Sequence, residues 1–357
     1  MISIILLGSI ENEKLVADTM SALKANPLLE LVLIAKTRPV VADVNYKFVP
    51  TGSSSPSACI AIAAGMTTGD TVLFVDGRAS IKDGSMLNVL ASIDSSTGVT
   101  WFPVEIERNG KSEIVELEEN TPEALLRAIT SDNALPTAAV AIRSSLLPKS
   151  EMPEADSAGE MLAKLMAQGI GEQSLTIRGD MMFSARAEVC TLSDKARASC
   201  LKVLANSSNI EDLFPHHDWI THEKESAAAA YHTMAALFLR VGDTASSMEC
   251  LKLSDQLEDS PRSLALKGLI AIDRGEILGA VANMVSSLQQ YEIRKKENEI
   301  HYSRFQPTDL EVINENLNAG LQALNKRDNE RALNHFATAV FNFDPFYSKY
   351  GVDRVSK

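Results

Sequence analysis

A carboxylate and a guanidinium stand two residues apart at the end of an apolar run. The run Thr71–Val75 is followed directly by Asp76-Gly77-Arg78. Ligands of open α/β sheets bind at the carboxyl ends of the strands, so Asp76 and Arg78 are the first candidates for a binding site. Two such neighbours can also neutralise each other in a structural ion pair. The residues alone leave both interpretations open.

A second candidate is the cluster Gly52-Ser-Ser-Ser-Pro-Ser57, which precedes a small-residue helix expected over Ala58–Met66. Ser54 and Ser55 could offer hydroxyls to a phosphate, together with backbone N–H groups at the start of the helix. The cluster is not a P-loop, because the sequence has no GxxxxGK[ST] pattern. The alternative is an ordinary loop that ends in a helix cap.

Histidine chemistry is confined to the second half of the chain. No histidine precedes His216, so the first half offers no Ser/His/Asp or Cys/His set, and hydrolases of that kind are disfavoured. His216, His217 and Asp218 lie together, with His222 close behind. Their spacing is poor for metal binding on a helix, which favours a packing turn between domains.

The elements that must position these residues follow an α/β pattern up to about residue 190. Short apolar runs alternate with amphipathic stretches, which predicts a mostly parallel sheet covered by helices. We expect helices over 11–26, 58–66, 121–131 and 159–168, and strands over 2–7, 30–35, 47–50, 71–75, 99–106, 138–142, 174–177 and 181–184. The last two strands are expected as edge strands or a hairpin.

From about Ser193 the pattern is helical and repetitive. Gly242-Asp243 and Gly275-Glu276 lie 33 residues apart, close to the 34-residue period of tetratricopeptide repeats. Three copies fit this repeat, over about 228–261, 261–294 and 313–345. The alternative is a generic helical bundle. Such repeats stack into a superhelix whose concave groove holds a peptide or protein partner.

Composition limits the partners and the compartment. The net charge of −13 and the pI near 5.0 argue against nucleic acid and anionic membranes. No apolar run is long enough for a membrane span, and the first residues lack the basic stretch of a signal peptide. The cysteines have no CxxC spacing, so we expect neither disulfides nor zinc, and a cytoplasmic protein. They are Cys59, Cys190, Cys200 and Cys250.

Residues 1–185 resemble the family 2 glycosyltransferases and their GT-A fold. The resemblance rests on the order of the elements. A small-residue helix leads into an apolar strand that ends in an aspartate, over Ser57–Arg78. An arginine-bearing strand, Ala139–Leu147, is followed by an acidic helix that ends in glycine, Ser157–Gly169.

The resemblance implies roles for single residues. In this family an Asp-x-Asp motif holds a divalent ion, Mn or Mg, at the diphosphate of a nucleotide sugar. Asp76 would keep one metal contact, whereas Arg78 replaces the second carboxylate and would itself offset the diphosphate charge. Lys36 stands where an acidic residue usually contacts the base; it would meet a phosphate or be merely solvated. Glu160 would be the catalytic base, or only a first-turn acid favoured by the helix dipole.

The sequence and its resemblance to this family leave two candidate functions. The first is a glycosyltransferase that moves a sugar from a nucleotide sugar to a protein acceptor held by the repeats. The second is an inactive relative that serves as an interaction scaffold. In both, residues 1–190 form the GT-A-like domain, 191–227 a helical connector, and 228–357 the repeats.

Overall fold

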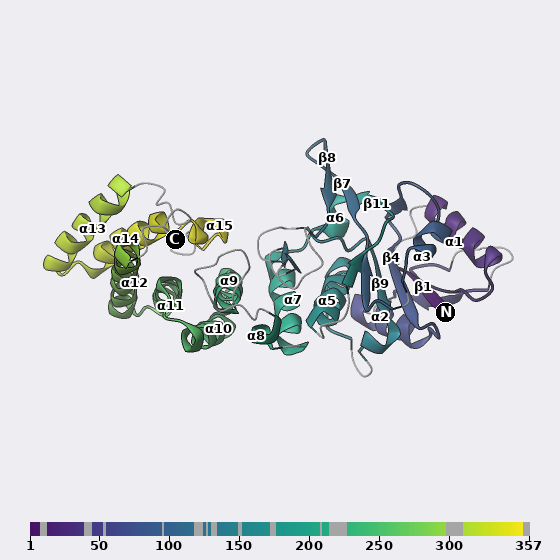
Figure 1. Cartoon of the computed structure of the whole chain (residues 1–357), viewed down its shortest axis with the longest axis horizontal. Coiled ribbons are helices and arrows are strands. Elements are labelled where there is room, and N and C mark those ends of the chain that lie inside the picture. The colour runs from purple at the N-terminus through teal and green to yellow at the C-terminus, as the bar shows by residue number, and fades with distance from the viewer. Residues whose placement is uncertain are drawn as a thin grey trace. The chain divides into compact units, whose positions relative to one another are not determined.

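The structure is a computed structural model of the 357-residue chain. It describes residues 1–7, 13–38, 45–52, 55–94, 96–117, 124–125, 128–129, 134–148, 152–171, 176–207, 209–213, 227–297 and 310–352. The chain divides into two compact units, unit 1 over Met1–Asn209 and unit 2 over Ile210–Lys357. Figure 1 shows an α/β unit and a helical unit, as the sequence predicts.

A seven-stranded mixed sheet forms the centre of unit 1, in the order β10-β6-β9-β4-β1-β2-β3. β9 is antiparallel to both neighbours and the other pairs are parallel, so the expectation of a mostly parallel sheet is confirmed. Its strands are β1 (Ile2–Leu7), β2 (Glu30–Ala35), β3 (Lys47–Pro50), β4 (Thr71–Asp76), β6 (Val99–Trp101), β9 (Ala139–Arg143) and β10 (Thr176–Arg178).

Helices cover both faces of this sheet (Figure 1). α1 (Glu13–Ala25) and α3 (Met86–Ala91) lie on one face, and α2 (Pro56–Gly65) and α5 (Ala158–Gly171) on the other. Every residue of β4 is buried. A strand covered on both sides needs apolar residues at every position rather than at alternate ones, which is why the central strands are continuous apolar runs in the sequence.

A smaller sheet follows where β6 and β10 end, in the order β5-β11-β7-β8. The sequence predicts one strand over 99–106, but the chain leaves the first sheet at Phe102-Pro103 and enters the second. Proline has no N–H to donate to a ladder, so the break falls at a residue that can only accept, as Pro103 does from the N–H of Phe183 at 3.0 Å. The strands are β5 (Ser80–Ile81), β7 (Val104–Arg108), β8 (Lys111–Val115) and β11 (Phe183–Arg186).

The remaining helices of unit 1 are short or peripheral. α7 (Asp194–Ser207) lies in the segment expected as a connector, and it packs against α5 in unit 1. α6 (Ala187–Cys190) follows β11, and a 3₁₀ turn (Ser144–Leu146) follows β9. The helix expected over 121–131 lies largely outside the described residues. Nowhere in the described part of the chain does a helix combine the length and apolar character that crossing a bilayer requires.

The part of unit 2 that the structure describes contains three helical hairpins, α9–α10, α11–α12 and α13–α14 (Figure 1). They occupy the three ranges in which the sequence predicts repeats. The helices of the unit are α8 (Ile210–Leu213), α9 (Ala227–Arg240), α10 (Thr244–Leu257), α11 (Pro261–Asp273), α12 (Ile277–Glu297), α13 (Leu310–Asn325), α14 (Asn329–Phe343) and α15 (Phe346–Lys349).

The hairpin turns explain the spacing of the repeats. Each turn places one residue in the left-handed region, with φ of 79° at Gly242, 73° at Gly275 and 61° at Arg327. Glycine adopts this conformation without steric cost. In the first and third hairpins the next residue, Asp243 or Asp328, then caps the following helix by accepting a backbone N–H bond of 3.1 Å.

The hairpins do not all pack in the same way. α11 packs against both α9 and α10, as in a regular stack, whereas the third hairpin meets α12 through its second helix, α14. Within the third hairpin, Gly320 lies under the Phe336 ring, and a Cβ at this position would come within 2.7 Å of that ring.

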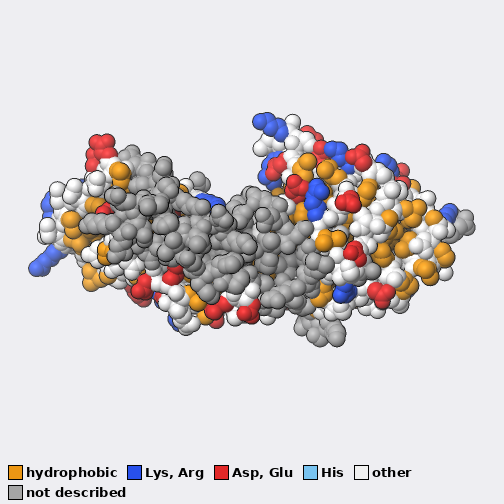
Figure 2. All heavy atoms as spheres, viewed as in Figure 1, with side chains coloured by type: hydrophobic (Ala, Val, Ile, Leu, Met, Phe, Trp, Pro, Cys, Tyr) orange, Lys and Arg blue, Asp and Glu red, His pale blue; other side chains and the backbone are white. Residues whose placement is uncertain are grey.

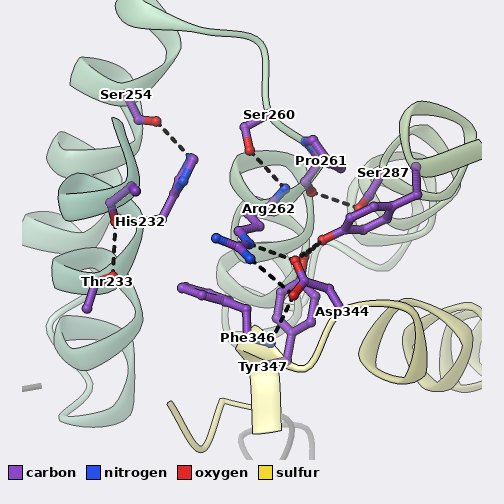
Figure 3. A network of polar contacts seen from close by, with 12 residues as sticks. His232, Thr233, Ser254, Ser260, Pro261, Arg262, Ser287, Asp344, Phe346 and Tyr347 are labelled. Atoms are coloured by element: carbon purple, nitrogen blue, oxygen red, sulfur yellow. Dashed lines mark hydrogen bonds and ion pairs between the residues drawn. The ribbon is translucent and has the colours of Figure 1, made fainter. Parts of the chain in front are cut away.

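A buried polar network ties the end of α14 to the second hairpin (Figure 3). Arg262 donates to both carboxylate oxygens of Asp344, from Nε at 2.6 Å and from Nη2 at 3.2 Å. Tyr291 donates its hydroxyl to the same carboxylate at 2.7 Å, and Tyr347 lies 3.0 Å from that hydroxyl. The Arg262 guanidinium also lies 4.6 Å from the centre of the Phe346 ring. This network fixes the segment after α14 against the start of α11.

Candidate functional site

Asp76 and Arg78 form a bidentate ion pair at the carboxyl end of β4. Arg78 donates from Nε to Oδ1 at 2.9 Å and from Nη2 to Oδ2 at 2.7 Å. Its backbone N–H also donates to Oδ1 at 2.9 Å. The Asp76 side chain is 3% exposed and the Arg78 side chain 32%. Both carboxylate oxygens are therefore engaged, while the guanidinium still reaches the surface.

The backbone around this pair is fixed by the strands on either side of β4. The N–H of Asp76 donates to the carbonyl of Ala138 at 2.8 Å, and the N–H of Gly77 donates to the carbonyl of Leu7 at 2.8 Å. The pair thus lies at the edge of the sheet where the parallel strands β1 to β4 end, the edge at which ligands of such sheets bind.

The start of α2 lies at this same edge, because α2 follows the end of β3. Ser55 caps the helix by accepting a bond of 3.2 Å from the N–H of Ala58. Ser57 accepts a bond of 2.7 Å from the N–H of Ala155, which joins the start of α2 to the segment before α5. The cap hydroxyl of Ser55 therefore already has a structural role. Ser54 lies outside the described residues.

The start of α5 also lies at this edge, through a short series of contacts. Thr137 donates its hydroxyl to the carbonyl of Val189 at 3.0 Å, and Ala138 accepts the Asp76 N–H. Gly159 packs on the same Val189 carbonyl, where a Cβ would come within 2.8 Å of the oxygen. A larger residue at 159 would push α5 away from the edge.

Glu160, in the first turn of α5, is held in a buried ion pair. Its Oε1 lies 2.8 Å from Nζ of Lys164, and the two side chains are 9% and 4% exposed. Its Oε2 accepts the N–H of Asp156 at 3.0 Å, and Lys164 also donates to the carbonyl of Glu154. The sequence analysis did not select Lys164, although Glu and Lys four residues apart on a helix are a known pairing signal.

The remaining sequence candidates are not drawn into this arrangement. Lys36, which follows β2, is exposed. Arg38 lies over the Tyr46 ring, 5.3 Å from its centre. The histidine cluster at 216–222 falls outside the described residues, so a metal or packing role there stays a prediction.

The residues described around Asp76 do not fit a divalent ion well. A hard cation such as Mg²⁺ or Mn²⁺ prefers several carboxylate or carbonyl oxygens, but both Asp76 oxygens accept from Arg78. Across the described ranges, no three His, Cys, Asp or Glu side chains come together in a group that could hold a metal. The metal contact assigned to Asp76 therefore remains a prediction, and binding there would first require Arg78 to move.

An open cavity of about 790 Å³ lies beside Arg78, over the second sheet. Figure 2 shows Lys, Arg, Asp and Glu side chains intermingled around the β7–β8 hairpin, at the upper edge of the view. Besides Arg78, its charged lining residues are Arg186, Glu105, Glu107 and Glu188. Three carboxylates and two guanidiniums thus line this cavity.

Comparison with known proteins gives only distant matches. No protein-family model matches the chain, and no curated protein sequence matches it. Among solved structures, S. aureus TarS 1-349 in complex with UDP is 14% identical, covers 95% of this chain and 90% of its own, and has a TM-score of 0.44. Glucosyl-3-phosphoglycerate synthase from Mycobacterium tuberculosis is 16% identical, covers 57% and 80%, and has a TM-score of 0.36. Similarity at this level carries no functional conclusion for this chain.

Proposed function

We propose that the chain is a glycosyltransferase-like protein of the inactive kind, in which the α/β unit keeps the layout of a nucleotide-sugar site and serves, with the helical unit, as a scaffold for protein partners. The observation that carries this proposal is the bidentate pair of Asp76 with Arg78. The carboxylate that would contact a metal in an active relative is nearly buried and bonded through both oxygens.

The pairing of Glu160 with Lys164 supports the same conclusion. A general base must have a free lone pair within hydrogen-bond reach of the proton that it removes. Both Glu160 oxygens have partners inside the fold. In an inactive protein the Asp76–Arg78 and Glu160–Lys164 pairs stabilise the site. An enzyme would have to break both pairs in each catalytic cycle.

An active transferase is the second candidate, favoured by one observation. The starts of α2 and α5 and the Asp76–Arg78 pair all lie at the carboxyl edge of the sheet, and Arg78 also lines an open cavity. In this alternative Arg78 turns from Asp76 to the diphosphate of a nucleotide sugar, Lys36 and Ser55 contact phosphate, and Glu160 acts as base. The acceptor would be a protein.

The helical unit is proposed to hold that partner in either case. In support, α11 packs against both helices of the hairpin before it, as neighbouring repeats in a stack do. Repeats of this kind commonly present a concave surface to a peptide. A continuous tetratricopeptide superhelix over all three hairpins is part of this proposal.

Calorimetric titration of the full chain with UDP, GDP and their common sugar conjugates, each with and without manganese, tests the proposal. We expect no saturable heat from a protein shown to be folded. Saturable binding would favour the transferase, and manganese dependence would place an ion with the nucleotide.

Two variants make a positive result interpretable. Asp76→Asn removes the carboxylate at the candidate site. Asp70→Asn removes an 85% exposed carboxylate that immediately precedes the first residue of the same strand. Binding lost only in Asp76→Asn would locate the nucleotide at Asp76. Equal binding in both variants would place it elsewhere.

A further inference from the structure

The second sheet of unit 1 has one polar face and one apolar face. Phe183, Val104 and Ile106 are buried in the hydrophobic core. The alternate residues form two rows across the sheet, as the strand register shows. Ser80, Ser184 and Glu105 make the first row, and Arg186, Glu107 and Ser112 the second. Ile114 follows Glu105 at the β8 end of the first row and is half exposed.

These two rows form most of the floor of the 790 Å³ cavity, since all six of their polar residues line it. Their carboxylates are unevenly paired. Glu105 accepts from Lys82 and from Ser112, each at 2.7 Å, and these bonds lower its pKa. Glu107 is exposed beside Ser112 in the second row. Of the two guanidiniums in the lining, Arg78 is already committed to Asp76. Arg186 lies beside Glu107 in the second row and 3.9 Å from Glu188, so three carboxylates face one guanidinium that Asp76 does not hold. The cavity therefore favours a cationic guest over an anionic one.

The rim of the cavity is an open strand edge. β8 is the last strand of the sheet, and among the strands that the structure describes it pairs only with β7. Its first four residues are exposed. Unpaired backbone groups along an edge can hydrogen-bond an added extended chain, whose alternate side chains then point to one face.

We propose that the polar face of the second sheet and the open edge of β8 together bind a basic peptide segment in an extended conformation. The backbone of the peptide pairs with β8, and its lysine or arginine side chains reach Glu107 and Glu105. The side chains between them point to the opposite face of the sheet. A guest of this kind satisfies both the excess of carboxylates and the open backbone edge, whereas a neutral saccharide uses neither.

The chain offers a matched control for this proposal. Glu113 lies on β8, one residue from Ser112, but on the opposite face, where it pairs with Arg108 at 3.7 Å and does not line the cavity. Glu107→Gln and Glu113→Gln therefore remove the same charge from the same hairpin on opposite faces.

The test is fluorescence anisotropy of the full chain with a labelled peptide of alternating lysine and serine. We expect saturable binding that weakens with salt. The affinity should be about two- to fivefold weaker in Glu107→Gln, as for the loss of one exposed ion pair. It should be unchanged in Glu113→Gln. A lysine–proline peptide of equal charge should bind more weakly, because proline has no N–H for the strand edge.

Several results would overturn the proposal. Absence of binding would do so, as would equal weakening in Glu107→Gln and Glu113→Gln, which would indicate diffuse attraction to an acidic protein. Full competition by a neutral chito-oligosaccharide would assign the cavity to sugar instead. The result does not depend on nucleotide binding, because the titrations with UDP and GDP are separate measurements that use variants of Asp76 and Asp70.

Discussion

Arg78 binds both oxygens of the Asp76 carboxylate from a position only two residues further along the chain, at 2.9 and 2.7 Å. The carboxylate is nearly buried, while a third of the guanidinium side chain remains exposed. A divalent ion or a diphosphate at this edge would have to compete with an intramolecular partner that is always present. Binding of a metal ion or a diphosphate at this edge therefore depends on whether the ion pair opens.

Replacing Arg78 by aspartate should recreate an Asp-Gly-Asp motif at the end of β4. Without metal, Arg78→Asp should lose about 2–4 kcal/mol of stability, because two carboxylates then face each other without a cation. Manganese should raise its Tm and give a bound signal in electron paramagnetic resonance. The neutral variant Arg78→Asn should show neither effect. A Tm that does not respond to manganese would mean that the edge has lost more than one ligand.

Lys164→Met should strongly destabilise unit 1. The substitution leaves the Glu160 carboxylate, 9% exposed, without its cation, which costs about 3–5 kcal/mol for a buried pair. Chemical denaturation measures the loss. The double variant Glu160→Gln/Lys164→Met should recover part of it, whereas the exposed control Lys195→Met should stay within about 0.5 kcal/mol of the wild type. A small loss in Lys164→Met itself would show that Glu160 reaches water.

Glu30 should make the stability of unit 1 depend on acid pH. Burial by itself raises the pKa of this carboxyl, but hydrogen bonds from Ser3, the Thr68 N–H and Lys47 outweigh it and lower the pKa from 4.5 to about 2. The unfolded chain then binds the proton more readily than the folded chain. The contribution of Glu30 is complete above about pH 4.5 and is lost as the pH falls toward 2.

Denaturation of the wild type and of Glu30→Gln between about pH 7 and pH 3 measures this effect. The stability difference between the two proteins should shrink as the pH falls. Asp83→Asn, at an exposed carboxylate, controls for the loss of one surface charge. A difference between wild type and Glu30→Gln that is constant over this range would contradict the assignment.

Asp344→Asn should loosen the C-terminal end of unit 2. The Asp344 side chain is fully buried and accepts from Arg262 and Tyr291, and losing its charge should cost about 2–4 kcal/mol. Hydrogen exchange should show the largest loss of protection around α15. Tyr291→Phe removes a single hydrogen bond and should cost only about 1 kcal/mol. Similar losses in the two variants would mean that charge contributes little to this network.

Arg327→Gly should stabilise the third hairpin. Arg327 adopts a φ of 61°, which costs a residue with a side chain about 1 kcal/mol and costs glycine almost nothing. Thermal denaturation should show a higher Tm. Gly242→Arg makes the reverse change at the equivalent turn of the first hairpin, where φ is 79°, and should lower the Tm. The changes in Tm of the two variants should thus have opposite signs. Changes of the same sign would refute the role of the turn residue.

Two buried strands of the first sheet could be predicted to the residue. The bounds expected for β1 and β2 are those observed, since a continuous apolar run between polar residues leaves little choice. The bounds of β3 also match, although β3 is an edge strand with a single buried residue. β8 was not predicted, because an exposed edge strand such as Lys111-Ser-Glu-Ile-Val115 carries no such signal. Of the two strands expected as edge strands or a hairpin, β10 is an edge strand, whereas β11 lies between β5 and β7, because pairing across the sheet is not encoded locally.

The candidate site was only partly predictable for a related reason. Sequence order places Asp76 at a strand end and Glu160 in the first turn of a helix, and the structure has both there. Which partner each carboxylate takes depends on burial and on side-chain direction. The ion pair of Asp76 with Arg78 was one of two open alternatives. The partner of Glu160 was missed, although Lys164 lies on the same helix.

The way the third hairpin meets the second has a consequence for cooperativity. In an open stack each hairpin offers the next the same surface, so the array can grow or shrink by one repeat and can unfold in steps. Here α14 rather than α13 faces α12, and the bond of Arg262 to Asp344 closes the chain back onto α11. Duplicating or deleting one hairpin would break this closure. Unit 2 should thus unfold in a single transition, as a closed domain of fixed repeat number.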